Sequence, residues 1–486
     1  MPKVSEFFRL GVTQPSLDFI DIHSERDVLL FVDPYAISLK SDVWSDLCMD
    51  HINSFFQSSV DLIHSGDEDA AKAVLSNLKE PKETGLGYGK SARRGRGVSG
   101  GKALDLYASL SRSRAAQTGL LTDLGEFDLF IDGIGPDGLS DITTNIIKRP
   151  LIEYTQKQCE LWKIPMREGV AVPRIWNSAR GEWGSDYFTL PILDDAPLLL
   201  VPKYSARRQM TLNSQEFYSD FVLDYLEKEE IRRGSSLVQT IKSSGRRKVL
   251  KKDLKAKYEF SKDFLAQFAE ATPEVLNNYK EFYRNLPGGA GSLSDEEILE
   301  KFDENFDPRA FAEALRIELR RIPGGSEHAT TYHRFMIGLF EFIFYPNFIY
   351  PELEAEIEDG RKRIDILYTN AAVHGVFHRL QSLAQTRSHV VPVECKNYTR
   401  EIANPELDQI AGRFSNERGW FGIICCRHLQ NKDRFIQRCK NTANAGRGTV
   451  LPLDDDDIDR VLEMLGQNRR TSVDEFLNQK IVEIIS

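Results

Sequence analysis

The chain has 486 residues, of which 41% are hydrophobic and 28% charged, and its net charge is −10 at pH 7. This composition is that of an ordinary globular protein, and the length favours about three domains. The acidic charge excludes a histone-like polyelectrolyte, although a local basic patch is enough to bind nucleic acid. The six cysteines are scattered without a CxxC pair, which argues against a zinc ribbon or a disulfide framework. Because there is neither a membrane-spanning apolar run nor a secretory signal pattern, we expect a cytoplasmic protein.

Residues 1–204 mix strand-like and helical patterns, which predicts an α+β domain with a recognition or regulatory role. Buried strands are predicted at Val28–Pro34 and Glu126–Gly133. Helices are predicted at Asp42–His64 and at Ile142–Trp162, the second beginning after Ser140 or Asp141.

A basic, glycine-rich stretch, Gly85–Lys102, interrupts this first segment and predicts a loop. Its GYGKS sequence has Thr84 where a P-loop needs its first glycine, and no apolar strand precedes it. An ATP-binding site is therefore disfavoured. A loop that touches phosphates and a plain surface loop both stay open.

Residues 205–325 are predicted to be mainly helical and to form a basic linker or interaction region. The stretch Lys242–Lys257 holds eight basic residues against one acid. Such a charge run is either a solvated helix face or a surface for a nucleic-acid backbone. The candidate nucleic-acid contacts in it are Arg246, Arg247, Lys248, Lys251 and Lys252.

Residues 326–486 alternate helical and strand patterns, which predicts an α/β domain with a mixed, largely buried sheet. A helix is predicted at Thr331–Phe344. Strands are predicted at 363–370, 389–398, 420–426 and 448–453, with helices between the later ones. The acid run Asp454–Asp457 precedes the last predicted helix, where carboxylates favour the helix N-terminus.

Three charged residues on two of these strands point to phosphodiester chemistry. Glu394 and Lys396 are two residues apart on an apolar strand, so both side chains lie on one face, and Asp365 is on the neighbouring strand. Two carboxylates can hold a hard divalent cation, which lowers the pKa of a bound water, and a lysine can orient that water or the phosphate. The alternative is a solvated salt bridge, but a buried strand seldom carries two charges on one face without a reason.

This pattern resembles the PD-(D/E)xK, or restriction-endonuclease-like, nuclease superfamily. Asp365 matches its lone acid and Glu394-Cys395-Lys396 its E-x-K. Glu341 stands where many members place another metal-ligand or supporting glutamate, and Gln409 where many place a glutamine after the E-x-K strand. The resemblance implies catalysis by these residues, with Mg²⁺ (replaceable by Mn²⁺) bound by Asp365, Glu394 and Glu341. It also implies a DNA endonuclease of bacterial restriction or anti-phage defence.

Other parts of the hypothesis stay open. Arg361 and Arg363 are candidate phosphate contacts at the rim of the site, or a solvated turn. The long insert between Asp365 and Glu394 is expected to form a helix or an excursion over the site. RNA is an alternative substrate, and a homo-oligomer or a partner protein is expected. The rival hypotheses are a non-catalytic nucleic-acid-binding or assembly protein that retains the nuclease-like fold, and an unrelated phosphohydrolase.

Overall fold

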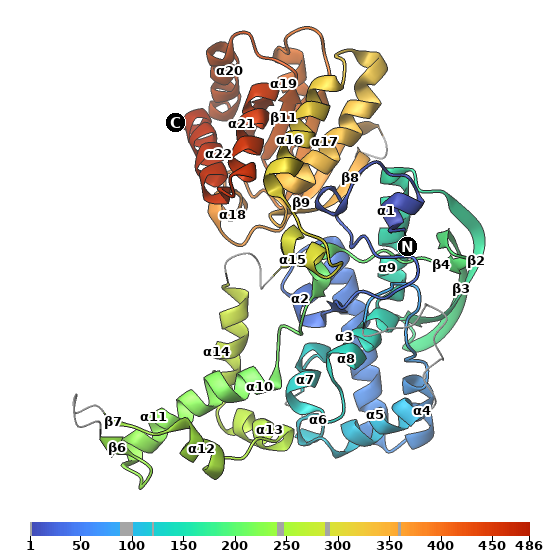
Figure 1. Cartoon of the computed structure of the whole chain (residues 1–486), viewed down its shortest axis with the longest axis vertical. Helices are drawn as coiled ribbons and strands as arrows, with labels where there is room; N and C mark the ends of the chain where they lie inside the picture. The colour runs from blue at the N-terminus through green and yellow to red at the C-terminus, as the bar shows by residue number, and fades with distance from the viewer. Residues whose placement is uncertain (1, 88–100, 119–120, 241–246, 287–291, 358–360) are drawn as a thin grey trace.

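The computed structural model describes residues 2–87, 101–118, 121–240, 247–286, 292–357 and 361–486. The C-terminal α/β domain lies at one end of the long axis, and residues 205–286 reach the other end (Figure 1). The N-terminal part lies between and beside them. None of the described helices combines the length and the apolarity needed to cross a lipid bilayer.

The N-terminal part is mainly helical and carries one long β-hairpin. Its helices are α1 (Val4–Phe7), α2 (Pro34–Ser38), α3 (Val43–Ser65), α4 (Glu68–Leu75), α5 (Gly101–Arg112), α6 (Arg114–Thr118), α7 (Phe127–Phe130), α8 (Pro136–Ile146) and α9 (Lys148–Trp162). Its strands are β1 (Phe31–Val32), β2 (Met166–Asn177), β3 (Glu182–Leu193), β4 (Ala196–Pro197) and β5 (Ala206–Arg207). β2 and β3 form the hairpin, and β1 pairs with β5.

Two of the predicted N-terminal elements are wrong. The predicted strand Glu126–Gly133 is helical, as α7, because a short apolar run does not distinguish a buried strand from a buried helix. The single helix predicted at Ile142–Trp162 is two helices, α8 and α9. Pro150, in the first turn of α9, has no N–H group with which to continue the backbone hydrogen bonds of α8. In addition, α8 begins at Pro136, earlier than predicted. The predicted helix at Asp42–His64 is confirmed as α3, which Asp42 caps.

The middle segment is helical, as predicted. It comprises α10 (Ser214–Glu216), a π-helical turn at Phe217–Val222, α11 (Leu223–Arg233), α12 (Lys251–Lys257), α13 (Lys262–Ala271), α14 (Pro273–Arg284), α15 (Asp295–Glu300), α16 (Pro308–Arg321) and the short strands β6 (Gln239–Thr240) and β7 (Arg247–Lys248). Ser294 and Glu297 form a capping box at the start of α15, which fixes the beginning of this helix.

The C-terminal domain is α/β, with a five-stranded mixed sheet in the order β12-β11-β10-β9-β8. The strands are β8 (Phe348–Ile357), β9 (Lys362–Asn370), β10 (Val390–Lys396), β11 (Phe421–Cys426) and β12 (Thr449–Asp454). The helices are α17 (Ala329–Phe344), α18 (Gly375–Ser382), α19 (Asn404–Ala411), α20 (Lys432–Asn444), α21 (Asp455–Gly466) and α22 (Arg470–Ile485). β8, β9 and β10 are antiparallel, whereas β10, β11 and β12 are parallel. The predicted mixed, buried sheet is thereby confirmed.

Helices cover both faces of this sheet around β10, which is buried almost throughout. Tyr368 of β9 reaches α17, where its hydroxyl donates to the Ile337 carbonyl. Glu394 of β10 reaches Gln409 of α19. Tyr368 pairs with Val391, so the two side chains lie on the same face of the sheet. Glu394 is three residues after Val391 on β10, and its side chain therefore points to the other face. It follows that α17 and α19 lie on opposite faces of the sheet.

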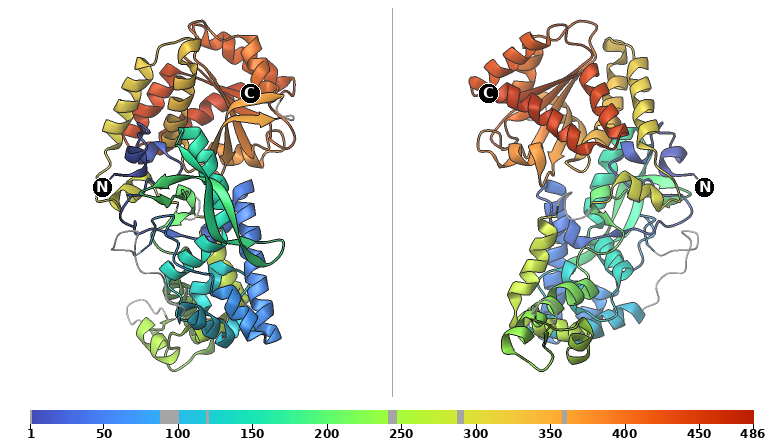
Figure 2. Two further views of the ribbon diagram at one scale, coloured as in Figure 1. Left: turned by 90° about the vertical axis from the view of Figure 1, so that its right-hand side faces the viewer. Right: turned by 60° about the vertical axis from the view of Figure 1, so that its left-hand side comes forward.

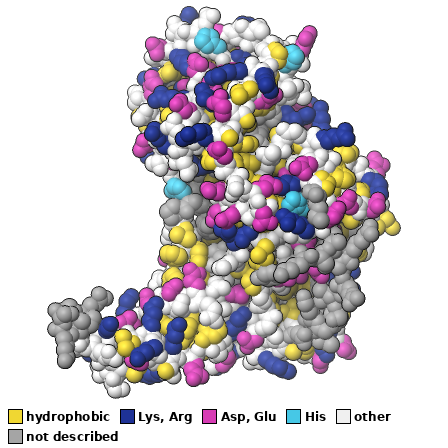
Figure 3. All heavy atoms as spheres, viewed as in Figure 1, with side chains coloured by type: hydrophobic (Ala, Val, Ile, Leu, Met, Phe, Trp, Pro, Cys, Tyr) yellow, Lys and Arg dark blue, Asp and Glu magenta, His cyan; other side chains and the backbone are white. Residues whose placement is uncertain are grey.

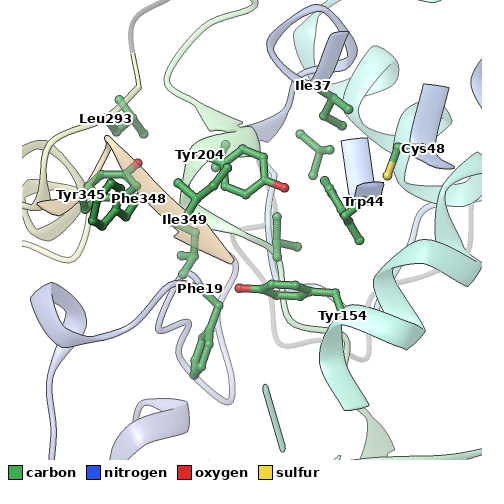
Figure 4. Close-up of a cluster of buried hydrophobic side chains, with 14 of the residues drawn as sticks. Phe19, Ile37, Trp44, Cys48, Tyr154, Tyr204, Leu293, Tyr345, Phe348 and Ile349 are labelled. Carbon is green, nitrogen blue, oxygen red and sulfur yellow. The ribbon is translucent and has the colours of Figure 1, made fainter. Parts of the chain in front are cut away.

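The C-terminal domain and the N-terminal part share one hydrophobic core. Figure 4 shows this shared cluster, in which side chains from both parts pack together: Trp44, Tyr154 and Tyr204 from the first, and Tyr345, Phe348 and Ile349 from the second. The turned views in Figure 2 show the same close stacking of the two parts. An interface of this apolar character favours a fixed arrangement of the two parts.

Candidate active site

Asp365, Glu394 and Lys396 meet in the C-terminal domain. Val393 pairs with Ile366 in the antiparallel register, which places Asp365 opposite Glu394 on the same face of the sheet. The Lys396 ammonium lies 2.7 Å from Glu394 Oε2 and 3.4 Å from Asp365 Oδ2. Asp365 Oδ2 also accepts a hydrogen bond of 2.8 Å from the Cys395 amide. The structure therefore brings the three predicted residues into one cluster.

The cluster is buried at one side and open at the other. Glu394 has no exposed surface and Lys396 is 6% exposed, whereas the Asp365 side chain is 22% exposed. Burial and the neighbouring Asp365 raise the pKa of Glu394, against the opposing effect of Lys396. For Lys396, burial alone would lower the pKa, but Glu394 and Asp365 outweigh it and the pKa is raised. The lysine is thus held as a cation between two acids.

Gln409 completes the buried side of the cluster, as predicted from its position after the E-x-K strand. Its amide Nε2 donates to Glu394 Oε2 at 2.8 Å. Sequence reasoning missed Arg413, whose Nε donates to Glu394 Oε1 at 3.2 Å. Arg413 lies in the turn after α19, four residues beyond Gln409. A spacing of four residues is the sequence signal that could have indicated it, because it brings side chains together on one side of a helix.

His333 of α17 is a second residue that sequence reasoning missed. Its Nε2 lies 3.0 Å from the Cys395 carbonyl and 4.0 Å from Asp365 Oδ2. No short motif links a helix residue to a strand 62 positions later, so the contact depends on tertiary packing.

Glu341 is not part of this cluster, so its placement among the metal ligands is wrong. It follows His333 by eight residues on α17, which separates the two by about 12 Å along the helix axis. Its carboxylate instead lies 3.0 Å from the ammonium of Lys203, which is also 3.2 Å from Asp295. Burial raises the pKa of Glu341 to about 8, with Lys203 opposing and Asp18 adding to that effect. Glu341 therefore serves the junction between the N-terminal part and the C-terminal domain.

Arg361 and Arg363 are the two candidate phosphate contacts at the rim of the site. Arg363 precedes Asp365 by two residues on the same face of β9, so it does lie at the rim. Its guanidinium already pairs with Glu354 at 3.3 Å and Glu356 at 3.0 Å on β8. Arg361 is exposed in the turn directly before β9. Local acids thus reduce the positive charge that Arg363 offers to a phosphate.

The basic segment lies far from the cluster. β7 and α12, which carry Arg247, Lys248, Lys251 and Lys252, lie at the end of the molecule opposite the C-terminal domain (Figures 1 and 2). Lys251 already lies 3.6 Å from both Asp220 and Asp224, and Figure 3 shows acidic side chains among the basic ones there. Arg246 lies outside the described residues. The structure does not bring these residues to Asp365 and Glu394.

The insert between β9 and β10 contains the predicted helix, α18, but it does not cover the cluster. β9 ends at Asn370 and β10 begins at Val390, and these ends lie together because Thr369 pairs with Val390. Asp365, Glu394 and Lys396 lie towards the other end of both strands. The insert therefore lies at the opposite end of the sheet, and the expected excursion over the site is wrong.

A second group of potential metal ligands lies at the ends of the neighbouring strands. Ligand atoms of His428, Asp454 and Asp456 lie within 4.8 Å of one another. Asp454 has a structural role, because it caps α21 in a capping box with Asp457 and pairs with Lys432 at 2.8 Å. This is the helix-start role that the sequence predicts for the acid run.

The chemistry of the main cluster fits a divalent cation. Asp365 is partly exposed, and its Oδ1 has no hydrogen-bond donor among the described residues, so one carboxylate oxygen is open. Glu394 Oε1 has only the longer bond from Arg413, at 3.2 Å. Carboxylate oxygens are the ligands that Mg²⁺ and Mn²⁺ prefer. Asp365 and Glu394 are therefore the two residues placed to hold one.

Comparison with known families gives one result. A family model described as "Domain of unknown function (DUF8370)" matches residues 9–213. Comparison with curated proteins and with solved structures gives no match. The matched residues cover the N-terminal part, whereas Asp365, Glu394 and Lys396 lie outside them. The family match therefore does not extend to the cluster.

Proposed function

We propose that this protein is a metal-dependent nuclease of the PD-(D/E)xK superfamily and that its C-terminal domain has the restriction-endonuclease-like fold. The observation that carries the proposal is the single contact network in which Lys396 bridges Asp365 and Glu394 on adjacent strands. A buried strand pays a desolvation cost for such a group of charges, which favours a chemical role over a structural one. The mixed sheet with helices on both faces is compatible with this fold.

In this proposal Asp365 and Glu394 hold Mg²⁺, or Mn²⁺ in its place. The ion would neutralise charge on the scissile phosphate and lower the pKa of a bound water. Lys396, kept protonated by the two acids, donates to the attacking water or to a phosphate oxygen. Gln409 and Arg413 hold the Glu394 carboxylate in one orientation, and His333 fixes the end of β10 beside Asp365.

The proposed substrate is DNA, because the superfamily is dominated by DNA enzymes, and the proposed setting is restriction or anti-phage defence in the bacterial cytoplasm. This rests on fold-level analogy. The N-terminal part and the middle segment would supply recognition, regulation or assembly, with nucleic acid, a second copy or a partner protein as their target. The exposed charges of α12 would contact a nucleic-acid backbone remote from the cleavage site.

The test is a cleavage assay with supercoiled plasmid, linear duplex DNA and single-stranded RNA, each with Mg²⁺ or with EDTA. We expect Mg²⁺-dependent cutting of DNA by the wild type, and none by Glu394→Gln or Lys396→Ala. Circular dichroism and thermal unfolding confirm that each variant is folded. Cutting that persists in both folded variants would overturn the assignment of the cluster.

A non-catalytic scaffold is the second candidate, because one observation favours it. Glu394 has no exposed surface, and Lys396, Gln409 and Arg413 engage both of its oxygens. A scaffold would bind nucleic acid equally well with and without Mg²⁺ and would never cut it. Equal binding by the wild type and Glu394→Gln, with no cleavage under any condition, would favour the scaffold.

A further inference from the structure

A concave site lies where the N-terminal part meets the middle segment, far along the chain from the E-x-K strand. It is an open cavity of about 600 Å³ beside β5, within the size range of small-molecule sites. The walls come from β1, from the residues around β5, from the end of α14 and from residues 293 and 301. Segments distant in sequence thus combine to build it.

Three cations border this cavity, namely Arg207, Arg208 and Lys301. No acidic residue is among the described residues that line it, although the chain as a whole has ten more acids than bases. Arg208 is partly neutralised by Glu300, with which it pairs. Lys301 is half-buried and has no ion-pair partner in the part of the chain that the structure describes. The cavity therefore has a positive lining in an acidic protein.

Among the three cations, Arg207 is the most informative, because it is buried and only 4% exposed. Its Nη1 donates to the carbonyls of Tyr204 and Ala206, both at 2.8 Å. Its Nε and Nη2 atoms have no hydrogen-bond acceptor among the described residues, and it forms no ion pair with them. A buried guanidinium without a paired carboxylate is costly unless another anion offsets it.

Lys40 shows that the positive charge of Arg207 extends into its surroundings. Burial and the nearby Arg207 together lower the pKa of Lys40 to about 8, against the opposing effect of Asp42. Asp33 and Glu297 attract Arg207 at longer range. The Asp33 carboxylate is already occupied, since it accepts from the amide and the hydroxyl of Thr211.

Apart from the polar Gln209 and Thr211, the rest of the lining is apolar or aromatic. Phe31, Tyr283 and Leu293 contribute to it, and Leu29 is 41% exposed although it is a large apolar residue. An exposed apolar side chain beside a cationic wall suits a ligand with a flat or apolar body and a charged group. A simple inorganic anion would leave this apolar wall unused.

We propose that this cavity binds a small phosphorylated molecule with an aromatic body, of the mononucleotide class. A phosphate carries up to two negative charges, which matches the group of cations better than a single carboxylate does, and a guanidinium is well suited to phosphate. The aromatic body would lie against Phe31 and Tyr283. This inference does not depend on the proposed nuclease, because none of the lining residues belongs to the Asp365 cluster.

The test is calorimetric titration of the full chain with AMP as the probe, alongside adenosine, pyrophosphate and a 5′-phosphorylated single-stranded oligonucleotide. We expect saturable binding of AMP, with affinity about tenfold or more above that of adenosine. Lys301→Ala and Arg207→Met should each weaken the binding of AMP severalfold or more. Lys157→Ala is the matched control at a different cavity and should leave binding unchanged.

Each outcome of this titration either supports the proposal or overturns it. Lys301 is half-buried and unpaired, so Lys301→Ala should fold even if the buried Arg207→Met does not. Failure of both AMP and pyrophosphate to bind would overturn the proposal. So would equal affinity for AMP and adenosine, or AMP binding that Lys301→Ala leaves unchanged. Binding of the oligonucleotide without AMP would show that the cavity takes the end of a nucleic-acid strand and not a small molecule.

Discussion

Replacing Glu341 by glutamine separates the role that its sequence position indicates from the role that the structure gives it. A metal ligand would be needed for cleavage. A buried acid at the junction, 3.0 Å from Lys203, would affect the pH dependence of stability. Glutamine keeps the size of the side chain and cannot ionise, and Lys203 keeps Asp295 as a partner at 3.2 Å. We therefore expect Glu341→Gln to change stability near neutral pH and to leave cleavage intact.

The size of the effect follows from the pKa of Glu341. Its ordinary value is 4.5 and burial raises it to about 8 in the folded chain. A carboxyl of this kind stabilises the fold fully below pH 4.5 and loses that contribution as the pH rises through about 8. Between pH 6 and pH 8 the folded state binds more protons than the unfolded state, so this group should remove about 2 kcal/mol of unfolding free energy.

The measurement is urea unfolding of the wild type and of Glu341→Gln at pH 6 and at pH 8. Glu327→Gln is the control, because Glu327 is exposed and close in sequence. From pH 6 to pH 8, the unfolding free energy of the wild type and of the control should fall by about 2 kcal/mol more than that of Glu341→Gln. Equal losses in all three proteins would refute the buried, raised pKa, and loss of cleavage by folded Glu341→Gln would restore the metal-ligand hypothesis.

Three further outcomes are expected. Lys203→Met leaves the buried Asp295 as well as Glu341 without a cation and should cost about 3–5 kcal/mol in urea unfolding. A loss below about 1 kcal/mol would contradict the buried network. Gly448→Ala should destabilise by about 2 kcal/mol or more, because φ is +97° and the new Cβ would overlap the Phe414 ring, whereas Gly446→Ala, at φ +70° with open space, should cost about 1 kcal/mol. Similar thermal shifts for these two would refute that packing. Gln409→Ala removes a donor to Glu394 and should slow single-turnover cleavage about tenfold with little change in melting temperature, and an unchanged rate would exclude a positioning role.

The alternation of helices and strands in the C-terminal domain could be predicted from the sequence because buried strands and capped helices have local signatures. Glu394 and Lys396 lie on one face of β10 because side chains two residues apart in a strand point the same way, and the neighbouring strand supplies Asp365. Gln409 follows from the position of the next helix. These relationships are local or nearly so, which explains why a pattern can indicate them.

The remaining features depend on contacts between distant segments. Glu341 contacts Lys203, 138 positions earlier, and no periodicity indicates such a pair. The insert after β9 could not be placed until the register showed at which end of the sheet it lies. The strand predicted at Glu126–Gly133 failed because burial on all sides suits either a helix or a strand, and tertiary packing decides between them.

The most direct test of the nuclease is a comparison of two aspartates of the C-terminal domain. Asp365→Asn removes the partly exposed carboxylate of the cluster, whereas Asp408→Asn alters an exposed aspartate of α19 that pairs with Arg447 at 2.9 Å. With supercoiled plasmid and Mg²⁺, the proposal predicts that Asp365→Asn loses cleavage while Asp408→Asn cuts as the wild type does. Equal cutting by both folded variants would contradict it.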